Sequence, residues 1–480
     1  MMDWIVTPAR LGGALALVLG YVGLCSSVAW RLRQQRQALL RERQSLQQTG
    51  AAGAAGAAAT GQGAAVLVVY ASQTGQAEAL ARDTARSLHA GGCPVQLVPV
   101  QELTLAQLQA SAHSLWLLST TGEGDAPDQA LAFVQHLLPQ SAALAGHTAQ
   151  VLALGDREYA QFCAFGLRVH GWLQAQGATS EVLCMDGSSA AAQAQALADW
   201  QARVGSVLHS ATGQTAAAGA ALDWQSADSS QSWVLRGRTH LNPGSQGGAV
   251  YLLDWVPEGG ALPQWESGDL VSLCPPGEPD MPRDYTIASV PADGCLQLLV
   301  RQSVRDDGAP GVASHWLCQD MPLGAALPLR LRAHSGFRLE GNMERPVVLI
   351  GNGTGLAGLY SHIKARVQQQ QFDHWLLFGE RSPAHDRLLD AQLQHWVEHG
   401  QLARLDRAWS RDVAQPGYVQ QLLAQQAERL RHWVERGAAI YVCGSLQGMA
   451  QGVDDMLGEI LGREQLLALA ASGRYRRDVY

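Results

Sequence analysis

The sequence predicts an α/β architecture that also contains a β-barrel, preceded by one transmembrane helix. Short apolar runs alternate with helix-length segments in residues 65–209 and again in residues 341–480, as in parallel sheets covered by helices on both faces. Residues 231–340 instead hold short strands separated by Pro or Gly, which indicates an antiparallel barrel. An uncharged stretch near the N-terminus has the length of a membrane-spanning helix.

The composition excludes several classes of protein. A chain of 480 residues is long enough for about three domains. Its 34 basic and 42 acidic residues give a net charge of −8, which argues against a nucleic-acid surface. The eight cysteines form no Cys-x-x-Cys pair and no His/Cys cluster at metal-ligand spacing, so we expect reduced thiols and no structural metal.

The N-terminal stretch, residues 11–30, predicts a membrane anchor within residues 1–31. A cleaved signal peptide is the alternative, because residues 27–29 resemble a cleavage site. Arginines directly after the stretch favour the anchor, since the positive-inside rule keeps the following chain in the cytoplasm. They are Arg31, Arg33, Arg36, Arg41 and Arg43. We therefore expect a single-pass protein of the inner (cytoplasmic) membrane with soluble domains in the cytoplasm.

Two stretches without apolar periodicity are expected to be tethers between the folded units. Residues 32–64 are basic and then rich in Gly and Ala. Residues 210–230 form a second such linker, between the first α/β domain and the barrel.

The first α/β domain is expected to have strands at residues 65–70, 95–100, 115–119, 151–154 and 182–185. In such sheets ligands bind beyond the carboxyl ends of the strands. Polar loops at residues 72–78, 119–125 and 154–159 occupy three of these ends. The first loop lacks the lysine of a nucleoside-triphosphate loop and suits a terminal phosphate at a helix start. Singly each loop is more often a polar turn, but together they indicate one site.

The three loops resemble the flavin mononucleotide (FMN) site of flavodoxin-like domains. The resemblance implies that the first loop holds the phosphate, Thr120 to Gly122 line one ring face and Tyr159 stacks on the other. Thr121 stands where many relatives have an aromatic residue, so that ring face is expected to be more open. The residues expected to bind FMN are Ser72, Gln73, Thr74, Gly75, Gln76, Ala77, Ser119, Thr120, Thr121, Gly122, Leu154, Gly155, Asp156, Tyr159 and Phe162.

The predicted barrel contains a strand-like run at residues 283–289, Arg-Asp-Tyr-Thr-Ile-Ala-Ser. Alternation places Arg283 and Tyr285 on one face and Thr286 on the other. An arginine can grip a diphosphate, a tyrosine can cover a ring, and a threonine hydroxyl can reach a ring nitrogen. Gly311 then starts a short helix whose N-terminus could meet a diphosphate. Alone, each feature is more often an ordinary barrel strand or a capped helix.

The second α/β domain begins with a strand at residues 347–350 that leads into a glycine loop, residues 351–358. Its Gly-x-Gly-x-x-Gly pattern is weak alone. The strand before it and the helix pattern after it strengthen the prediction of a pyrophosphate site, because glycines in this position let backbone amides approach a pyrophosphate closely. Further strands are expected at residues 375–379 and 439–443.

The order of these units resembles the diflavin reductases, from about residue 65 to residue 480. The resemblance is closest to the flavoprotein subunits of NADPH-sulfite reductase, in residues 154–156, 408–412, 441–444 and 474–480, and it extends to microsomal NADPH-cytochrome reductase. It implies a ferredoxin-reductase-like barrel that binds FAD and a following NADPH-binding domain. It also implies electron flow from NADPH to FAD to FMN and then to a haem-containing redox acceptor.

The same resemblance assigns residues to the second flavin and to hydride transfer. Tyr480 is implied to lie over the FAD ring where nicotinamide enters. Without the resemblance, Cys443 would be a buried strand-end cysteine and Asp478 a solvated tail charge. The residues implied to bind FAD are Arg283, Tyr285, Thr286, Gly311, Val312, Ser314 and Tyr480. Those implied to act in hydride transfer are Thr286, Cys443, Asp478 and Tyr480.

For NADPH, the resemblance implies a diphosphate site and a pocket for the extra ribose phosphate. Arg411 would supply the fixed charge that favours NADPH over NADH, although Pro416 replaces a lysine found in some relatives. The diphosphate residues are Gly351, Thr354, Gly355 and Arg381. The ribose-phosphate residues are Ser410, Arg411, Tyr418 and Gln420.

The chain departs from such relatives in the barrel. Only about fifty residues separate Trp233 from Arg283, so the helical connecting domain of these relatives does not fit there. An acidic rim near the FMN loops could steer a basic partner, and a solvated loop surface explains it equally well. The rim consists of Glu123, Asp125, Asp128, Asp156 and Glu158.

Two alternative functions stay open. The same electron chain could feed a membrane haem protein or a ferric chelate. A non-catalytic flavin redox scaffold is the alternative of another class, and the intact set of Thr286, Cys443 and Asp478 argues against it.

Overall fold

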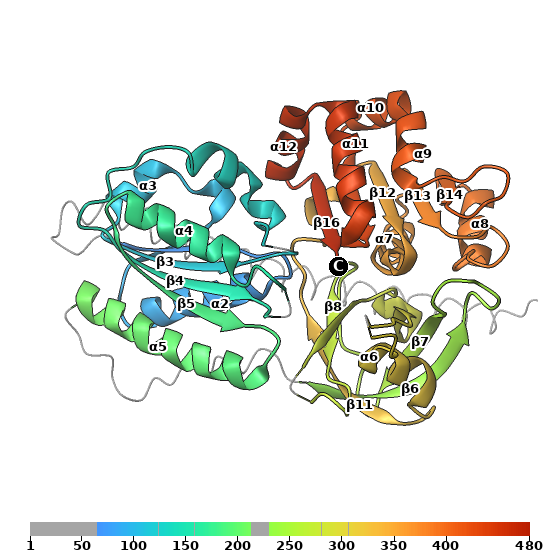
Figure 1. Cartoon of the computed structure of the whole chain (residues 1–480), viewed down its shortest axis with the longest axis horizontal. Coiled ribbons are helices and arrows are strands. Elements are labelled where there is room, and N and C mark those ends of the chain that lie inside the picture. Colours follow the sequence, from blue (N-terminus) through green and yellow to red (C-terminus); the bar gives the residue numbers. More distant parts are fainter. Residues whose placement is uncertain (1–64, 123, 158, 213–229, 280, 306) are drawn as a thin grey trace, which may run out of the picture.

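The computed structural model describes residues 65–122, 124–157, 159–212, 230–279, 281–305 and 307–480. Three sheets follow one another along the chain (Figure 1). The first and third are parallel and covered by helices, and the middle one is an antiparallel barrel. The C-terminus lies where the three units meet (Figure 1).

The first sheet has the strand order β2-β1-β3-β4-β5, with every pairing parallel. The inner strand β1 is buried along its whole length, as expected for a strand covered on both faces. The strands are β1 (Val66–Ala71), β2 (Val95–Pro99), β3 (His113–Ser119), β4 (Thr148–Gly155) and β5 (Thr179–Asp186). The helices are α2 (Gln76–Ala90), α3 (Leu105–Ala110), α4 (Ala164–Ala175) and α5 (Ala190–Thr212).

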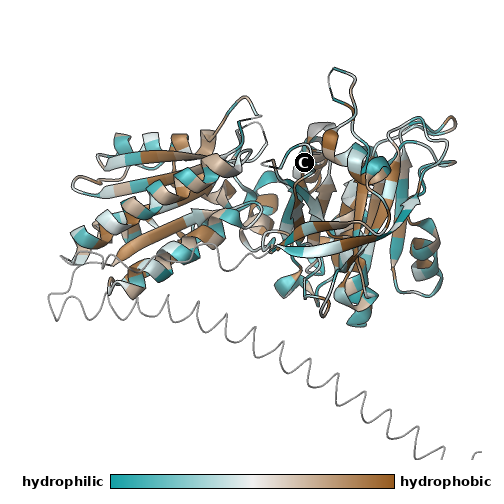
Figure 2. Cartoon of the chain, turned by 90° about the horizontal axis from the view of Figure 1, so that it is seen from below, coloured by the Kyte–Doolittle hydropathy of each residue, from teal (hydrophilic) through white to brown (hydrophobic). Residues whose placement is uncertain are grey.

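Each face of this sheet carries its own apolar core. Helices α2 and α5 cover one face, where Trp200 is buried, and α3 and α4 cover the other, where Trp116 and Phe165 are buried. Figure 2 shows apolar strands between helices whose outer surfaces are polar. All five predicted strands are present. Helix α5 continues two residues past the predicted start of the linker, and residues 213–229 lie outside the described part.

The middle sheet has the order β10-β7-β6-β11-β8-β9 and closes through an antiparallel bridge between Ile287 and Leu298. Buried tryptophans, including Trp233 and Trp255, fill its interior. A short helix, α6 (Val312–His315), follows β10 and begins after Gly311. The strands are β6 (Gln231–His240), β7 (Val250–Pro257), β8 (Leu270–Leu273), β9 (Arg283–Thr286), β10 (Leu296–Arg301) and β11 (Ala326–Arg332). The predicted barrel is therefore present.

The third sheet is parallel, with the order β14-β13-β12-β15-β16. Its strands are β12 (Val347–Asn352), β13 (His374–Glu380), β14 (Arg404–Trp409), β15 (Ala439–Gly444) and β16 (Tyr475–Val479). Helices α7 (Leu356–Gln368) and α8 (Asp390–Glu398) pack on one face. The other face is covered by α9 (Val419–Gln425), α10 (Ala427–Glu435), α11 (Gln451–Leu461) and α12 (Arg463–Ala471).

The predicted fold class needs one correction, the N-terminal transmembrane helix. No helix in the part of the chain that the structure describes is long and apolar enough to cross a membrane. The longest, α5, has 23 residues but exposes Asp199 and other polar side chains along one side, so it is a surface helix. The predicted span, residues 11–30, lies outside the described residues. The predicted inner-membrane location loses its support with it.

Candidate functional site

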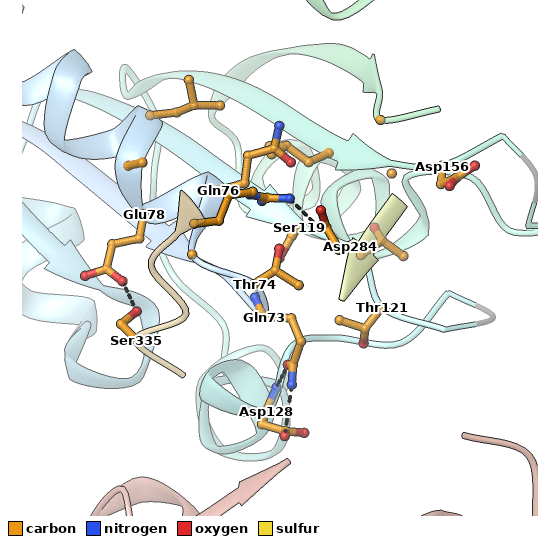
Figure 3. A pocket seen from close by; sticks show the side chains of 18 of the residues that line it. Gln73, Thr74, Gln76, Glu78, Ser119, Thr121, Asp128, Asp156, Asp284 and Ser335 are labelled. Atoms are coloured by element: carbon orange, nitrogen blue, oxygen red, sulfur yellow. Dashed lines mark hydrogen bonds and ion pairs between the residues drawn. The ribbon is translucent and has the colours of Figure 1, made fainter. Parts of the chain in front are cut away.

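A cavity of about 1790 Å³ lies where the carboxyl edge of the first sheet faces the barrel and the C-terminal unit (Figure 3). The three predicted loops after β1, β3 and β4 form one wall. Strand β9 contributes Arg283 and Asp284 from the barrel, and β16 contributes Arg477 and Val479. The structure thus brings the loops together at one site, as the sequence predicted for carboxyl ends of parallel strands.

The first loop has the geometry of a phosphate cradle. Gly75 precedes α2 with φ of 82°, a conformation that favours glycine. A Cβ at Gly75 would lie 2.5 Å from the carbonyl oxygen of Ala333, so the absence of a side chain also permits the barrel to approach. Thr74 and Gln76 line the cavity. Ser72 and Ala77 do not line it, and the buried Ser72 hydroxyl has no hydrogen-bond partner among the described residues.

Gln73 connects the first loop to other parts of the chain. Its side-chain oxygen accepts from the Asp128 amide at 3.0 Å, and its side-chain nitrogen donates to the Arg477 carbonyl at 2.9 Å. Its backbone amide donates to the Ser119 hydroxyl at 3.1 Å. Figure 3 shows Gln73 directed toward Asp128. Gln73 therefore holds the loop in place, and its neighbours Thr74 and Gln76 face the cavity where a ligand would bind.

The second and third loops line the cavity through Ser119, Thr120, Thr121, Gly122, Leu154, Gly155, Asp156 and Tyr159. The Thr120 hydroxyl is buried and has no hydrogen-bond partner within the described residues. Tyr159 is 44 % exposed, so its ring is accessible to a planar ligand. Phe162, in contrast, does not line the cavity; the Arg157 guanidinium lies over its ring at 4.9 Å.

The predicted acidic rim is only partly available to a partner. Asp125 and Asp156 line the cavity, but Asp128 forms an ion pair with Arg477 of the C-terminal unit. Glu123 and Glu158 lie outside the described residues.

Strand β9 shows the predicted alternation. Tyr285 and, directly after the strand, Ile287 pack against the barrel core, whereas Ala288 packs in the core of the C-terminal unit. Burial raises the pKa of the Tyr285 phenol. Arg283 forms an ion pair with Glu278 at 3.2 Å, and it still lines the cavity. The assignment of Arg283 and Tyr285 to a flavin stays a prediction.

Three predicted hydride-path residues meet at the boundary between the barrel and the C-terminal unit. The Thr286 hydroxyl donates to Oδ2 of Asp478 at 2.7 Å, and the Cys443 thiol donates to the same oxygen at 3.6 Å. All three residues are buried. Burial and the neighbouring Asp478 carboxylate hold the pKa of the Cys443 thiol well above its usual range, so the thiol stays neutral.

Tyr480 lies beside this group at the end of the chain. Its hydroxyl donates to Oγ1 of Thr354 at 3.1 Å, and its backbone amide donates to the Gly444 carbonyl at 3.1 Å. The side chain is 56 % exposed. An aromatic ring held at its backbone and at its tip can cover the hydride site and leave when nicotinamide enters.

Serine hydroxyls form hydrogen bonds at the start of α6, the helix whose N-terminus was predicted to meet the FAD diphosphate. Ser314 accepts a hydrogen bond from the Ser303 amide at 3.1 Å, and the two hydroxyls are 2.8 Å apart. A Cβ on Gly311 would lie 2.0 Å from the Ser303 hydroxyl. Val312 begins α6.

The glycine loop after β12 makes a close approach to β15. A Cβ added at Gly351 would lie 2.4 Å from the Cys443 carbonyl oxygen, and a Cβ added at Gly355 would lie 2.1 Å from the same oxygen. Neither position therefore admits a side chain. Arg301 of the barrel lies next to Gly353 and pairs with the buried Glu380 at the end of β13. Arg381 follows directly and approaches Gly247.

The residues predicted for the ribose phosphate gather at one end of the third sheet. The amide of Ser410 donates to the Glu380 carbonyl at 2.8 Å, and the amide of Arg411 donates to the Arg381 carbonyl at 2.7 Å. Tyr418, 55 % exposed, is the residue directly before α9. Gln420, two residues later, lies against Gly452 of α11. The diphosphate and ribose-phosphate candidates are therefore neighbours.

The ion pairs that join the units were not predicted from the sequence. Arg301 with Glu380 and Arg477 with Asp128 each link residues from separate units. Alternation in the final strand could have signalled that Arg477 and Asp478 face different ways. Among the described residues, no three His, Cys, Asp or Glu side chains are grouped so as to hold a metal ion.

Both α/β units match known protein families. The flavodoxin family matches residues 68–200, and the oxidoreductase NAD-binding domain family matches residues 349–455. The fold and the site thus define a flavoprotein oxidoreductase.

Full-length relatives refine this class. The chain is 28 % identical to the sulfite reductase [NADPH] flavoprotein alpha-component of Klebsiella pneumoniae, covering 90 % of this chain and 92 % of that one. It is 27 % identical to the proteins of the same name from Bacillus subtilis and Escherichia coli K12, over 86 % of this chain and 89 % and 90 % of theirs. These matches support the resemblance to the diflavin reductase family.

The matched domains fit the predicted cofactors FMN, FAD and NADPH. The structure supports the fit at the FMN loops, since the Thr120 hydroxyl is buried without a hydrogen-bond partner among the described residues while Thr120 lines the cavity. The alignment with the Klebsiella protein spans 558 positions, more than the 480 residues of this chain. That relative therefore contains residues that this chain lacks.

Proposed function

We propose that this chain is an NADPH-dependent diflavin oxidoreductase that passes electrons from NADPH through FAD and FMN to a redox acceptor protein. The observation that carries the proposal is the group of Thr286, Cys443 and Asp478 at the boundary between the barrel and the glycine-loop unit. When bound, the flavins and NADPH supply the electron chemistry. The chain binds, orients and shields them.

The hydride site needs a buried charge that is ready before the reaction. Asp478 accepts hydrogen bonds from Thr286 and Cys443. Its carboxylate would balance the positive charge that nicotinamide acquires on hydride transfer. Cys443 stays a neutral thiol, so it contributes no competing negative charge. Tyr480 closes the site against water when nicotinamide is absent.

NADPH binding is assigned to residues at the carboxyl edge of the third sheet. The loop with Gly351, Thr354 and Gly355 would hold the diphosphate together with Arg381. Arg411, with Ser410, Tyr418 and Gln420, would bind the extra phosphate, for which a guanidinium offers two parallel hydrogen bonds.

The FMN and FAD sites would face each other across the 1790 Å³ cavity. The cavity is lined on one side by the FMN loops and on the other by β9, which holds Arg283. Direct facing is consistent with the short stretch of barrel between β6 and β9, which holds only β7 and β8 among its described residues.

The relatives are named as the flavoprotein alpha-component of sulfite reductase, which favours another component of such an enzyme as the acceptor. The family resemblance implies that this acceptor contains haem. The test is a purified full chain to which FAD and FMN are added. We expect about one molecule of each flavin to remain bound per chain and NADPH to be oxidised with ferricyanide as acceptor. Flavin binding without NADPH oxidation would instead identify a non-catalytic flavin scaffold.

A further inference from the structure

A pair of thiols lies behind the third loop of the cavity. Cys163 caps the start of α4 with φ of 57°, a conformation uncommon for residues other than glycine. Its thiol points onto the sheet, 3.2 Å from the Ala153 carbonyl of β4 and 4.0 Å from the Met185 carbonyl of β5. Ala153 is the residue paired with Cys184 across these two strands. The Cys163 thiol therefore lies over the position of Cys184.

Strand alternation directs Cys184 toward the same place. Leu183 packs with the core on the α2 and α5 face, and Val182 packs with Phe165 on the α3 and α4 face. Cys184 is two residues after Val182, so its side chain is on the α4 face, where Cys163 begins the helix. The two thiols are hydrogen-bonded to each other.

The two thiols differ in the way that peroxide chemistry requires. Cys184 is half-buried on the edge strand β5, whereas Cys163 is fully buried. The hydrogen bond from Cys163, and to a smaller extent the Arg157 guanidinium, lower the pKa of the Cys184 thiol in spite of its partial burial, which favours its thiolate. The pKa of Cys163 is raised by the same hydrogen bond and by burial. Cys184 is thus the attacking thiol and Cys163 the resolving one.

We propose that Cys163 and Cys184 form a reversible intramolecular disulfide when the protein meets hydrogen peroxide. The Cys184 thiolate attacks one peroxide oxygen, the O–O bond breaks, and protonation of the departing hydroxide gives water and a sulfenic acid. The Cys163 thiol then displaces the sulfenic hydroxyl as a second water. Two thiols lose two electrons and two protons, and one peroxide is reduced to two waters.

The disulfide would act on the cavity through Gly155. A Cβ on Gly155 would lie 2.6 Å from the Cys163 amide nitrogen and 3.0 Å from its sulfur, so the third loop rests directly on this cysteine. Movement of Cys163 toward Cys184 would be transmitted to Gly155 and Asp156 of the cavity wall. This consequence rests on the proposed FMN site, whereas the disulfide itself does not.

The test treats the reduced full chain with one equivalent of hydrogen peroxide and then alkylates the remaining thiols with N-ethylmaleimide. We expect loss of about two of the chain's eight thiols, a peptide pair joined through Cys163 and Cys184 in non-reducing mass spectrometry, and full recovery with dithiothreitol. Both cysteines recovered as alkylated thiols, or Cys184 as a sulfinic acid without a cross-link, would overturn the proposal.

Variants separate the roles of the two cysteines. Cys163→Ser should leave Cys184 as a sulfenic or sulfinic acid, and Cys184→Ser should leave Cys163 reduced. Cys295→Ser changes another half-buried cysteine and should leave the cross-link intact. FMN affinity should change about fivefold between the reduced and cross-linked wild type. Equal FMN affinities of the reduced and cross-linked protein would overturn the proposed effect of the disulfide on the cavity. A chain that binds no FMN would overturn the proposed function, but disulfide formation between Cys163 and Cys184 would be unaffected by that result.

Discussion

The Thr286 hydroxyl donates a 2.7 Å hydrogen bond to Oδ2 of Asp478, although 192 residues separate them in sequence. Thr286 ends β9 of the barrel, and Asp478 lies in β16 of the third sheet. The Cys443 thiol reaches the same carboxylate at 3.6 Å from the neighbouring strand. The three groups meet only when the two units pack, so the hydride site is a product of their interface.

Asp478→Asn should slow flavin reduction by NADPH. The variant keeps the shape of the side chain but removes the charge that would balance the nicotinamide cation. A charge-assisted interaction of about 1.5–3 kcal/mol corresponds to roughly 10- to 100-fold in rate. Stopped-flow absorbance measures the step, and the NADPH dissociation constant should change far less. Asp455→Asn, on the exposed side of α11, is the control, and an unchanged hydride step in Asp478→Asn would refute the assigned role.

The contact of the first loop with the segment after the barrel can be tested with two glycines. A Cβ on Gly336 would lie 2.9 Å from the Gln73 carbonyl oxygen, whereas a Cβ on Gly341 would meet nothing within 4 Å. Gly336→Ala should therefore separate the flavodoxin-like unit from the barrel and slow electron delivery to FMN by about tenfold. Gly341→Ala should behave as wild type. Equal rates in the two variants would show that this contact is not needed for electron transfer.

The ion pair between Asp128 and Arg477 should stabilise the same docked arrangement. Both side chains are mostly buried, and without Asp128 the Arg477 guanidinium keeps only the more distant Asp454 carboxylate, at 3.8 Å. Asp128→Asn should lower the FAD-to-FMN transfer rate by about tenfold and leave the hydride step intact. The double variant Asp128→Arg with Arg477→Asp should recover part of the rate. If the double variant shows no recovery of the rate, although circular dichroism shows that it and Asp128→Asn are folded, the pair does not act through attraction between opposite charges.

Arg411→Ala should narrow the preference for NADPH over NADH. The guanidinium contributes to binding only when the ribose carries a phosphate, and a charged hydrogen bond of about 1.5–3 kcal/mol predicts a 10- to 100-fold loss in the ratio of kcat/KM values. Arg429→Ala on α10 serves as the control, because that side chain is exposed and bonds only locally, to Gln426 directly before the helix. A ratio that stays at the wild-type value would refute the phosphate pocket.

Two buried histidines predict loss of stability on acidification. Burial lowers the pKa values of His362 and His374 to about 3. The folded state keeps both neutral, so the unfolded state binds more protons below pH 6.5, and stability falls from there toward pH 3. Each residue contributes up to about 1.4 kcal/mol per pH unit. His362→Gln should flatten the decline of the urea midpoint between pH 7 and 5, whereas the exposed His209→Gln should not.

Strand positions and loop identities could be predicted from the sequence because both depend on local patterns. Apolar runs marked β1 to β5, and hydroxyls or glycines marked the loops beyond their ends. The pairing of Arg477 with Asp128 could not be predicted, since it depends on how two folded units pack. Phe162 shows the same limit, because its ring is covered by Arg157 and does not line the cavity.

The most direct test of the account is anaerobic rapid mixing of the flavin-loaded full chain with NADPH, followed by absorbance and by flavin analysis. We predict a first reduction phase at FAD that Asp478→Asn slows and a second phase at FMN that Gly336→Ala slows. The first phase should be unchanged in Gly336→Ala. Oxidised spectra after mixing with excess NADPH, in a chain shown to hold both flavins, would contradict it.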